Sequence, residues 1–99
     1  VWISGQIPLD PISMTLVKGD IAAQAEQVFT NLAAIAEAAG GTLNNAVKVN
    51  ISLTDLSDFD AVNTVMASHF EAPYPARACV QVAALPKGAD IEVEAILVL

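Results

Sequence analysis

Hydrophobic residues recur at spacings of three and four between residues 21 and 39, and this period predicts an amphipathic helix. Asp20 precedes the pattern as a favourable N-cap, and Gly40 with Gly41 ends it. We therefore predict a helix over Ile21–Ala39. Its buried stripe comprises Ile21, Ala25, Val28, Phe29, Leu32, Ile35, Ala36 and Ala39.

A second helix is predicted after Ser57, which is its expected N-cap, with Asp60 three residues later as a variant of the capping box. The residues of its apolar stripe are Phe59, Val62, Met66 and Phe70. A loop is predicted over residues 73–75, which contain two prolines.

Alternation of apolar and polar residues predicts three strands, over Ala46–Leu53, Ala76–Val82 and Ile91–Leu99. The apolar face of the first strand consists of Val47, Val49, Ile51 and Leu53. In the other two strands, Arg77, Cys79, Gln81, Glu92 and Glu94 alternate with apolar residues.

The first twenty residues predict less regular structure. Val1–Ser4 is typical of the end of a strand, and we expect this strand to be incomplete. Gly5–Pro11 is predicted to be irregular, because two prolines oppose strand pairing. Leu16 and Val17 form a further short strand candidate.

This order of elements predicts one α+β domain over residues 1–99, a mixed sheet with two helices packed on one face. The other face of the sheet is left without a helix. We expect it to carry Lys48, Asn50, Ser52, Arg77, Cys79, Gln81, Glu92 and Glu94, with Trp2, Ile96 and Val98 as apolar contacts among them.

Composition indicates that this uncovered face meets another subunit. Apolar residues make up 55% of the chain and charged residues 15%, against about 25% charged in ordinary domains, and the mean hydropathy is +0.55. A domain of 99 residues cannot bury that much apolar surface alone. No run is long enough for a membrane-spanning helix, for which roughly 18 apolar residues are needed. An oligomer is therefore expected.

Charge and cysteine content exclude several function classes. The net charge is −7, with 11 acidic residues against 4 basic ones, so nucleic-acid binding is disfavoured. The single cysteine, Cys79, allows neither an intrachain disulfide nor a thiolate metal cluster. We expect a cytoplasmic protein without a metal site.

The only arginine, Arg77, is the most informative candidate residue. Its planar guanidinium suits bidentate binding of a carboxylate. A structural ion pair with Glu92, Glu94 or a neighbouring subunit is an equally open interpretation. Glu92 and Glu94 share one strand face, and paired carboxylates can divide acid and base work, although exposed alternation is commoner. Cys79 is more typical of a small buried residue than of a nucleophile.

Several segments together resemble the RidA/YjgF family of reactive-intermediate deaminases. They are Ser4-Gly5-Gln6-Ile7-Pro8, Gln24 and Asn31, Ala38-Ala39-Gly40, Asp58-Phe59, Val62-Asn63, Pro75–Val82, Leu85-Pro86-Lys87-Gly88 and Ile91–Ala95. The resemblance implies a chorismate-mutase-like fold and a homotrimer whose sheets surround a central barrel, with sites between subunits. It also implies cofactor-free hydrolysis of 2-imino acids to 2-oxo acids and ammonia.

By the same resemblance, Arg77 would hold the substrate carboxylate and Glu92 would position or activate the attacking water. The backbone of Cys79 would help to place that water, and Ser4, Gly5 and Asn63 would line the pocket. Two alternatives stay open: an endoribonuclease activity described for some members of the family, and a non-catalytic trimer that binds a small carboxylate through Arg77.

Overall fold

A computed structural model describes all 99 residues and contains a four-stranded sheet and two helices. In chain order the elements are β1 (Trp2–Gln6), α1 (Ile21–Ala38), β2 (Ala46–Leu53), α2 (Phe59–His69), β3 (Ala76–Gln81) and β4 (Ile91–Leu97). Three short 3-10 turns cover Leu43–Asn45, Leu56–Asp58 and Pro86–Gly88. No helix is both long and apolar enough to cross a membrane.

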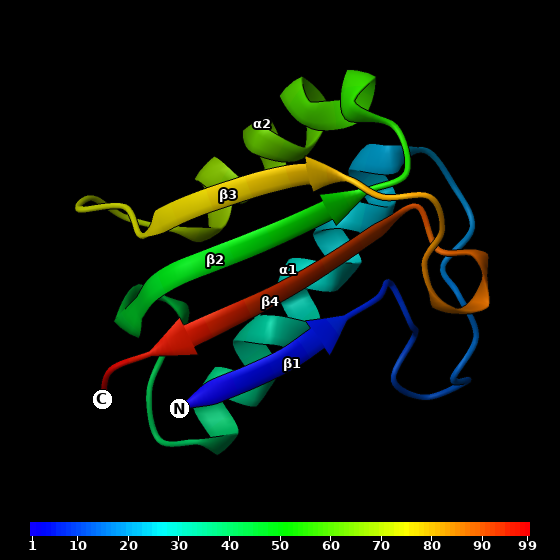
Figure 1. The fold of residues 1–99 in the computed structure, drawn as a ribbon. Coiled ribbons are helices and arrows are strands. Elements are labelled where there is room, and N and C mark those ends of the chain that lie inside the picture. Colours follow the sequence, from blue (N-terminus) through cyan, green and yellow to red (C-terminus); the bar gives the residue numbers. More distant parts are fainter.

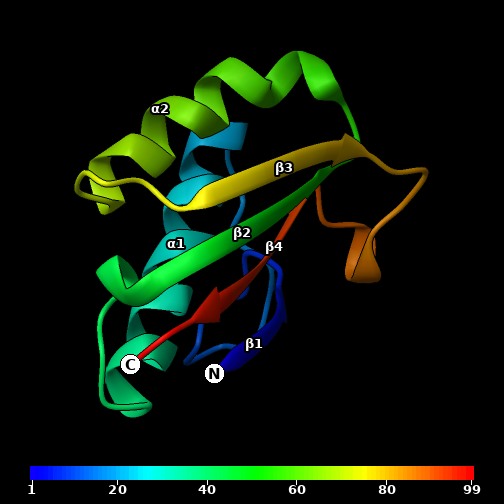
Figure 2. The ribbon, with the colours of Figure 1, turned by 60° about the vertical axis from the view of Figure 1, so that its left-hand side comes forward.

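The strands lie in the order β1-β4-β2-β3, so β1 and β3 form the two edges of the sheet. β4 runs antiparallel to β1 and β2, whereas β2 and β3 are parallel. Figures 1 and 2 show that both helices lie on the same side of the sheet. The predicted α+β class, a mixed sheet with two helices on one face, is therefore confirmed. We call the other side of the sheet the open face.

The predicted first helix is confirmed, with its end one residue earlier than expected. The Asp20 carboxylate accepts a hydrogen bond from the Ala23 backbone N–H at 2.9 Å, which fixes the start of the helix. Gly40 follows with a φ of 96°, a left-handed conformation that favours glycine. The stripe residues with no exposure are Ala25, Val28, Phe29, Leu32 and Ala36.

The prediction that Ser57 caps the second helix is wrong. The chain first makes a 3-10 turn, and Asp55 caps that turn by accepting a hydrogen bond from the Ser57 backbone N–H at 2.9 Å. This bond lowers the pKa of Asp55. The helix then begins at Phe59, after Asp58, which makes no side-chain capping bond.

At the N-terminal edge, β1 extends to Gln6 rather than ending at Ser4. Trp2 pairs with Ile96, and Gln6 pairs with Val93. The register shifts between Ile3 and Gln6, where Gly5 lies, and the pairing of β1 with β4 continues beyond this irregularity. Leu16 and Val17 form no strand, because Leu16 makes only an isolated bridge.

A similar shift at the start of β2 corrects the predicted position of Val47. The register moves between Ala46 and Lys48, so Ala46 is buried and Val47 is 48% exposed. The rest of the strand follows the predicted alternation, with Val49, Ile51 and Leu53 buried. At the C-terminal edges, β3 and β4 end at Gln81 and Leu97 instead of Val82 and Leu99.

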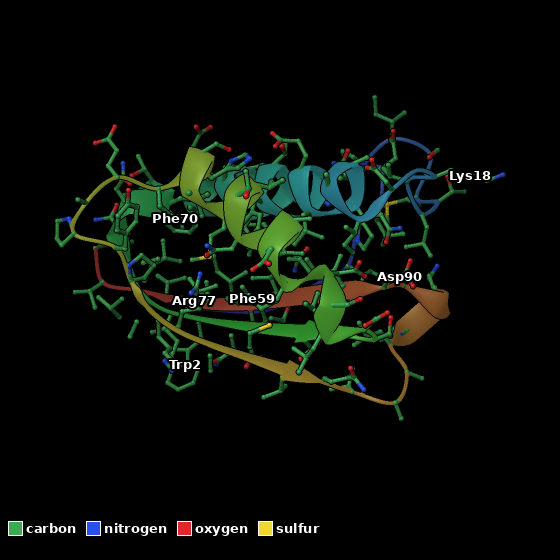
Figure 3. All side chains as sticks on the ribbon, turned by 90° about the horizontal axis from the view of Figure 1, so that it is seen from above. Trp2, Lys18, Phe59, Phe70, Arg77 and Asp90 are labelled. Atoms are coloured by element: carbon green, nitrogen blue, oxygen red, sulfur yellow. The ribbon has the colours of Figure 1, made fainter.

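The face assigned to β3 is also wrong, and this correction matters most for function. In the parallel ladder Arg77 lies beside Val49, and Cys79 beside Ile51. Aligned neighbours in a sheet point to the same face, and Val49 and Ile51 face the helices. Arg77, Cys79 and Gln81 are therefore on the helix side, and Ala78 and Val80 are on the open face. Figure 3 shows Arg77 on the helix side of the sheet and Trp2 on the opposite side.

The packing of α1 is the strongest test of this fold. Leu32 has no exposure and belongs to the single hydrophobic core that α1 forms with the sheet. We expect Leu32→Ala to lower the free energy of unfolding by about 2–5 kcal/mol, because it leaves a cavity. Ile12→Ala is the control, since Ile12 is 94% exposed, and it should change stability by no more than about 0.5 kcal/mol. Urea unfolding at one protein concentration measures both; equal losses would contradict the packing.

Candidate functional site

Arg77 lies on the edge strand β3 and is held by two residues of α2. One of its terminal nitrogens, Nη1, donates a hydrogen bond to Oδ1 of Asn63. Its guanidinium carbon lies 5.0 Å from the centroid of the Phe59 ring, within the range of a cation–π contact. Phe59 and Asn63 are four residues apart, so they project from the same side of the helix. Figure 3 shows Phe59 and Arg77 together between α2 and the sheet.

No carboxylate of the chain neutralises Arg77. The only ion pair joins His69 and Glu26 at 2.9 Å, between α2 and α1. The interpretation of Arg77 as half of an ion pair with Glu92 or Glu94 is therefore wrong within the chain. The bond to Asn63 is the only one that Arg77 donates, and the remaining N–H groups of the guanidinium are left for a ligand.

Two hollows of about 480 Å³ each flank the guanidinium, and Arg77 is the residue that they share. The first is lined by Asn63, Met66, Ala67, Tyr74, Pro75 and Arg77. The second is lined by Leu56, Phe59, Arg77 and Cys79. A carboxylate ligand bound to Arg77 thus has room for its remaining atoms on either side of the arginine.

Cys79 is a half-buried thiol in the second of these hollows. Burial raises the pKa of the Cys79 thiol, and the positive charge of Arg77 opposes that rise in part. The thiol therefore stays protonated at neutral pH. The only histidine is occupied by its pair with Glu26, so no imidazole is placed to activate Cys79.

Glu92 lies on the open face, next to β1. It pairs in register with Ser52, and a Cβ added at Gly5 would lie only 2.5 Å from Oε1 of Glu92. A glycine at position 5 is what allows the Glu92 side chain to lie over β1, beside the exposed Ser4. Glu94 differs from Glu92, because its Oε1 accepts a hydrogen bond from Nδ2 of Asn50 at 3.1 Å. Glu92 is the carboxylate without such a partner.

The predicted site residues therefore form two clusters instead of one. The arginine cluster contains the predicted residues Asn63, Arg77 and Cys79, together with Phe59, which was not predicted, at the β3 edge on the helix side. Those of the glutamate cluster are Ser4, Gly5 and Glu92, on the open face toward the β1 edge. The sheet lies between them, so Arg77 and Glu92 of one chain do not meet.

Three residues around Arg77 were not predicted for the site: Phe59, Met66 and Tyr74. A signal for Phe59 and Met66 was available in the spacing, since Phe59, Asn63 and Met66 recur at four and three residues along α2. No group of three or more His, Cys, Asp or Glu side chains is placed to hold a metal ion.

Known proteins are similar to this chain over its whole length. The family model described as endoribonuclease L-PSP matches residues 1–99. A curated protein of Capra hircus named 2-iminobutanoate/2-iminopropanoate deaminase is 48% identical over 98 residues, which cover 99% of this chain and 72% of that protein.

Solved structures agree with the fold. The crystal structure of RidA from the Antarctic bacterium Psychrobacter sp. PAMC 21119 has a TM-score of 0.95 and 59% identity, covering 99% of this chain and 79% of that one. The structure of E. coli TdcF with bound serine has a TM-score of 0.91 and 40% identity, covering 99% and 79% of the two chains.

Fold and geometry define a small α+β protein with an unpaired arginine set at the edge of a mixed sheet. The match over the whole chain and the identity to these relatives establish its family. The chain belongs to the RidA/YjgF family, the family of the endoribonuclease L-PSP model.

The raised pKa of Cys79 has a measurable consequence. At pH 8 the folded protein should react with iodoacetamide more slowly than the urea-unfolded chain, because a smaller fraction of the thiol is ionised. Arg77→Gln should slow the reaction further, because it removes the charge that favours the thiolate. Lys18→Gln removes a charge from a different hollow and should have no effect. Mass spectrometry follows the reaction, and a folded rate equal to the unfolded rate would contradict the assignment.

Proposed function

We propose that this chain hydrolyses 2-imino acids to 2-oxo acids and ammonia, as a homotrimer with its sites between subunits. The observation that carries the proposal is the arginine cluster. The only guanidinium of a chain with 11 carboxylates has no ion pair and lies between two hollows. Relatives named 2-iminobutanoate/2-iminopropanoate deaminase, at 44–48% identity, support the same reaction.

In this proposal Arg77 binds the carboxylate of the substrate. A guanidinium and a carboxylate form two parallel charge-assisted hydrogen bonds, which fix the plane of the substrate as well as its position. The backbone of Cys79 and the side chain of Asn63 complete the binding surface on this side. The imine carbon is then held at a defined distance from the opposite wall of the site.

Glu92 would act on the water. A protonated imine carbon is already electrophilic, so the reaction needs an oriented water and a base that accepts its proton. Addition of water forms a tetrahedral carbinolamine, and transfer of a proton to its nitrogen lets ammonia leave as the 2-oxo acid forms. Glu92 is suited to this role because, unlike Glu94, its carboxylate accepts no hydrogen bond from the chain.

Assembly supplies what one chain lacks. The open face exposes Trp2 by 82% and Val80 by 52%, with Val98 next to the sheet exposed by 62%. These apolar side chains are expected to pack against neighbouring copies, in a trimer whose chorismate-mutase-like subunits surround a central barrel. That packing would bring the glutamate cluster of one subunit to the arginine cluster of the next, with Ser4 and Gly5 lining the pocket. We also propose a cytoplasmic location, where the free thiol of Cys79 stays reduced.

The two alternatives have less support. The family model is described as an endoribonuclease, but a net charge of −7 opposes binding to a phosphate backbone. A non-catalytic carboxylate-binding trimer would use the same Arg77. It differs from the enzyme in one respect, since it would have no need of Glu92.

Removal of Arg77 tests the proposed activity. A dehydratase supplies 2-aminoacrylate, and release of the 2-oxo acid is followed with and without the protein. We expect the wild-type protein to accelerate release and Arg77→Ala to reduce kcat/KM at least about tenfold, because each charge-assisted hydrogen bond is worth about 1.5–3 kcal/mol. Lys18→Ala is the matched loss of one positive charge and should keep full activity.

Glu92→Gln separates catalysis from binding in the same assay. It should abolish most of the acceleration while 2-oxobutanoate still binds. Full activity in Glu92→Gln would remove Glu92 from the mechanism, and no acceleration by the wild-type protein would refute the deaminase proposal.

Shared sites predict complementation between inactive variants. Arg77→Ala and Glu92→Gln subunits, unfolded together in equal amounts and refolded, should regain about a quarter of wild-type activity, because a heterologous interface pairs an intact Arg77 with an intact Glu92 in that fraction of sites. Native mass spectrometry should give three copies. Each variant refolded alone is the control, and a mixture no more active than its components would contradict sites shared between subunits.

A further inference from the structure

Phe59 contacts Arg77 through the face of its ring, and Asn63 contacts the same guanidinium through its amide oxygen. The guanidinium carbon lies 5.0 Å from the ring centroid, while Asn63 takes one N–H at the rim. A carboxylate binds in the plane of the guanidinium, along its N–H edge. Asn63 accepts only one of the five guanidinium N–H groups, so the other four remain for a carboxylate.

An exposed arginine has many rotamers, and most of them do not direct the guanidinium at a ligand. Arg77 is exposed, and no carboxylate of the chain restrains it. The two contacts from α2 are the restraints that remain, an aromatic face on one side and an amide oxygen on the other. Both come from one helical turn, so they are fixed relative to each other.

We propose that Phe59 is a positioning residue for the reaction, which pre-orients Arg77 for the substrate carboxylate, and that Asn63 acts in the same way. This inference rests on the proposed function of Arg77. Phe59 is half-buried and also packs against the core, so its removal has a structural effect as well. The test therefore separates an effect that passes through Arg77 from one on the fold.

The first measurement needs no activity. The chain has one arginine, so the arginine side-chain resonances in a nitrogen-15 NMR spectrum belong to Arg77 alone. In the wild-type protein they should show an upfield ring-current shift, which Phe59→Tyr keeps and Phe59→Leu loses. An unchanged Arg77 spectrum in a folded Phe59→Leu protein would overturn the proposal.

The second measurement is a double-mutant cycle. With Arg77 present, Phe59→Leu should raise KM for the 2-imino acid, and the Kd for 2-oxobutanoate, about threefold to tenfold with kcat little changed. Phe59→Tyr should restore both to within about twofold of wild type. In an Arg77→Ala background, Phe59→Leu should change kcat/KM by less than about twofold, because the group that it positions is absent.

Controls make each outcome decisive. Phe70→Leu removes a buried ring that packs against Phe29, away from the arginine cluster, and should lower stability without raising KM. If Phe59→Leu does not fold, Phe59→Met replaces it, because Met keeps most of the volume and lacks the aromatic face. If Phe59→Leu lowers kcat/KM equally with and without Arg77, the positioning role of Phe59 is overturned, while the proposed function of Arg77 stands. A wild-type protein that neither binds 2-oxobutanoate nor accelerates hydrolysis would overturn the proposed function and this inference together.

Discussion

The central strand β2 is paired on both sides, and its register determines where the functional residues of its neighbours point. Its buried side chains, Val49, Ile51 and Leu53, must face the helices, because burying them stabilises the core. The parallel ladder to β3 then directs Arg77 and Cys79 toward α2. The antiparallel ladder to β4 directs Glu92 and Glu94 to the other face. A shift of one residue in either ladder would reverse that assignment.

This constraint connects two features that looked separate. Part of the excess of apolar residues lies on the open face, where Trp2 and Val80 are exposed. The separation of the glutamate cluster from the arginine cluster reflects the two faces of the same sheet. Association through the open face would bury these apolar side chains. It would also bring the glutamate cluster of one subunit to the arginine cluster of another. In the proposed enzyme, stability and catalysis would then depend on one set of contacts, and a dissociated subunit would have no complete site.

Sequence patterns predicted the elements whose burial is strongly one-sided. The stripe of α1 was clear because its apolar residues recur every three to four positions, and β2 was clear because polar residues alternate with Val and Ile. β3 was assigned to the wrong face because its burial follows no such contrast. β3 is an edge strand beside the short helix α2. Its polar Arg77 therefore lies over the aromatic ring of Phe59 on the helix side, while Ala78 and Val80 lie on the open face. Hydrophobicity alone cannot distinguish solvent from a site or from a subunit interface.

Among the candidate site residues, Arg77 was evident from its uniqueness and Glu92 from the family resemblance. The proposed preference for Glu92 over Glu94 has a local basis in the hydrogen bond from Asn50 to Glu94, which no one-dimensional pattern contains. Phe59 was overlooked because an aromatic residue in an apolar stripe is ordinarily a core residue. Its second role depends on a contact between elements that are distant in sequence.

The first turn of α2 carries a consequence for how such chains can vary in length. Asp55 closes the 3-10 turn over Leu56–Asp58, and α2 begins immediately afterwards with Phe59. Each residue inserted between Phe59 and Asn63 would rotate one of them relative to the other by about 100° around the helix axis. The two side chains would then no longer project together from the side of α2 that faces Arg77, although neither had been replaced. Insertions and deletions in this turn of the helix should therefore be selected against as strongly as substitutions in the candidate site itself.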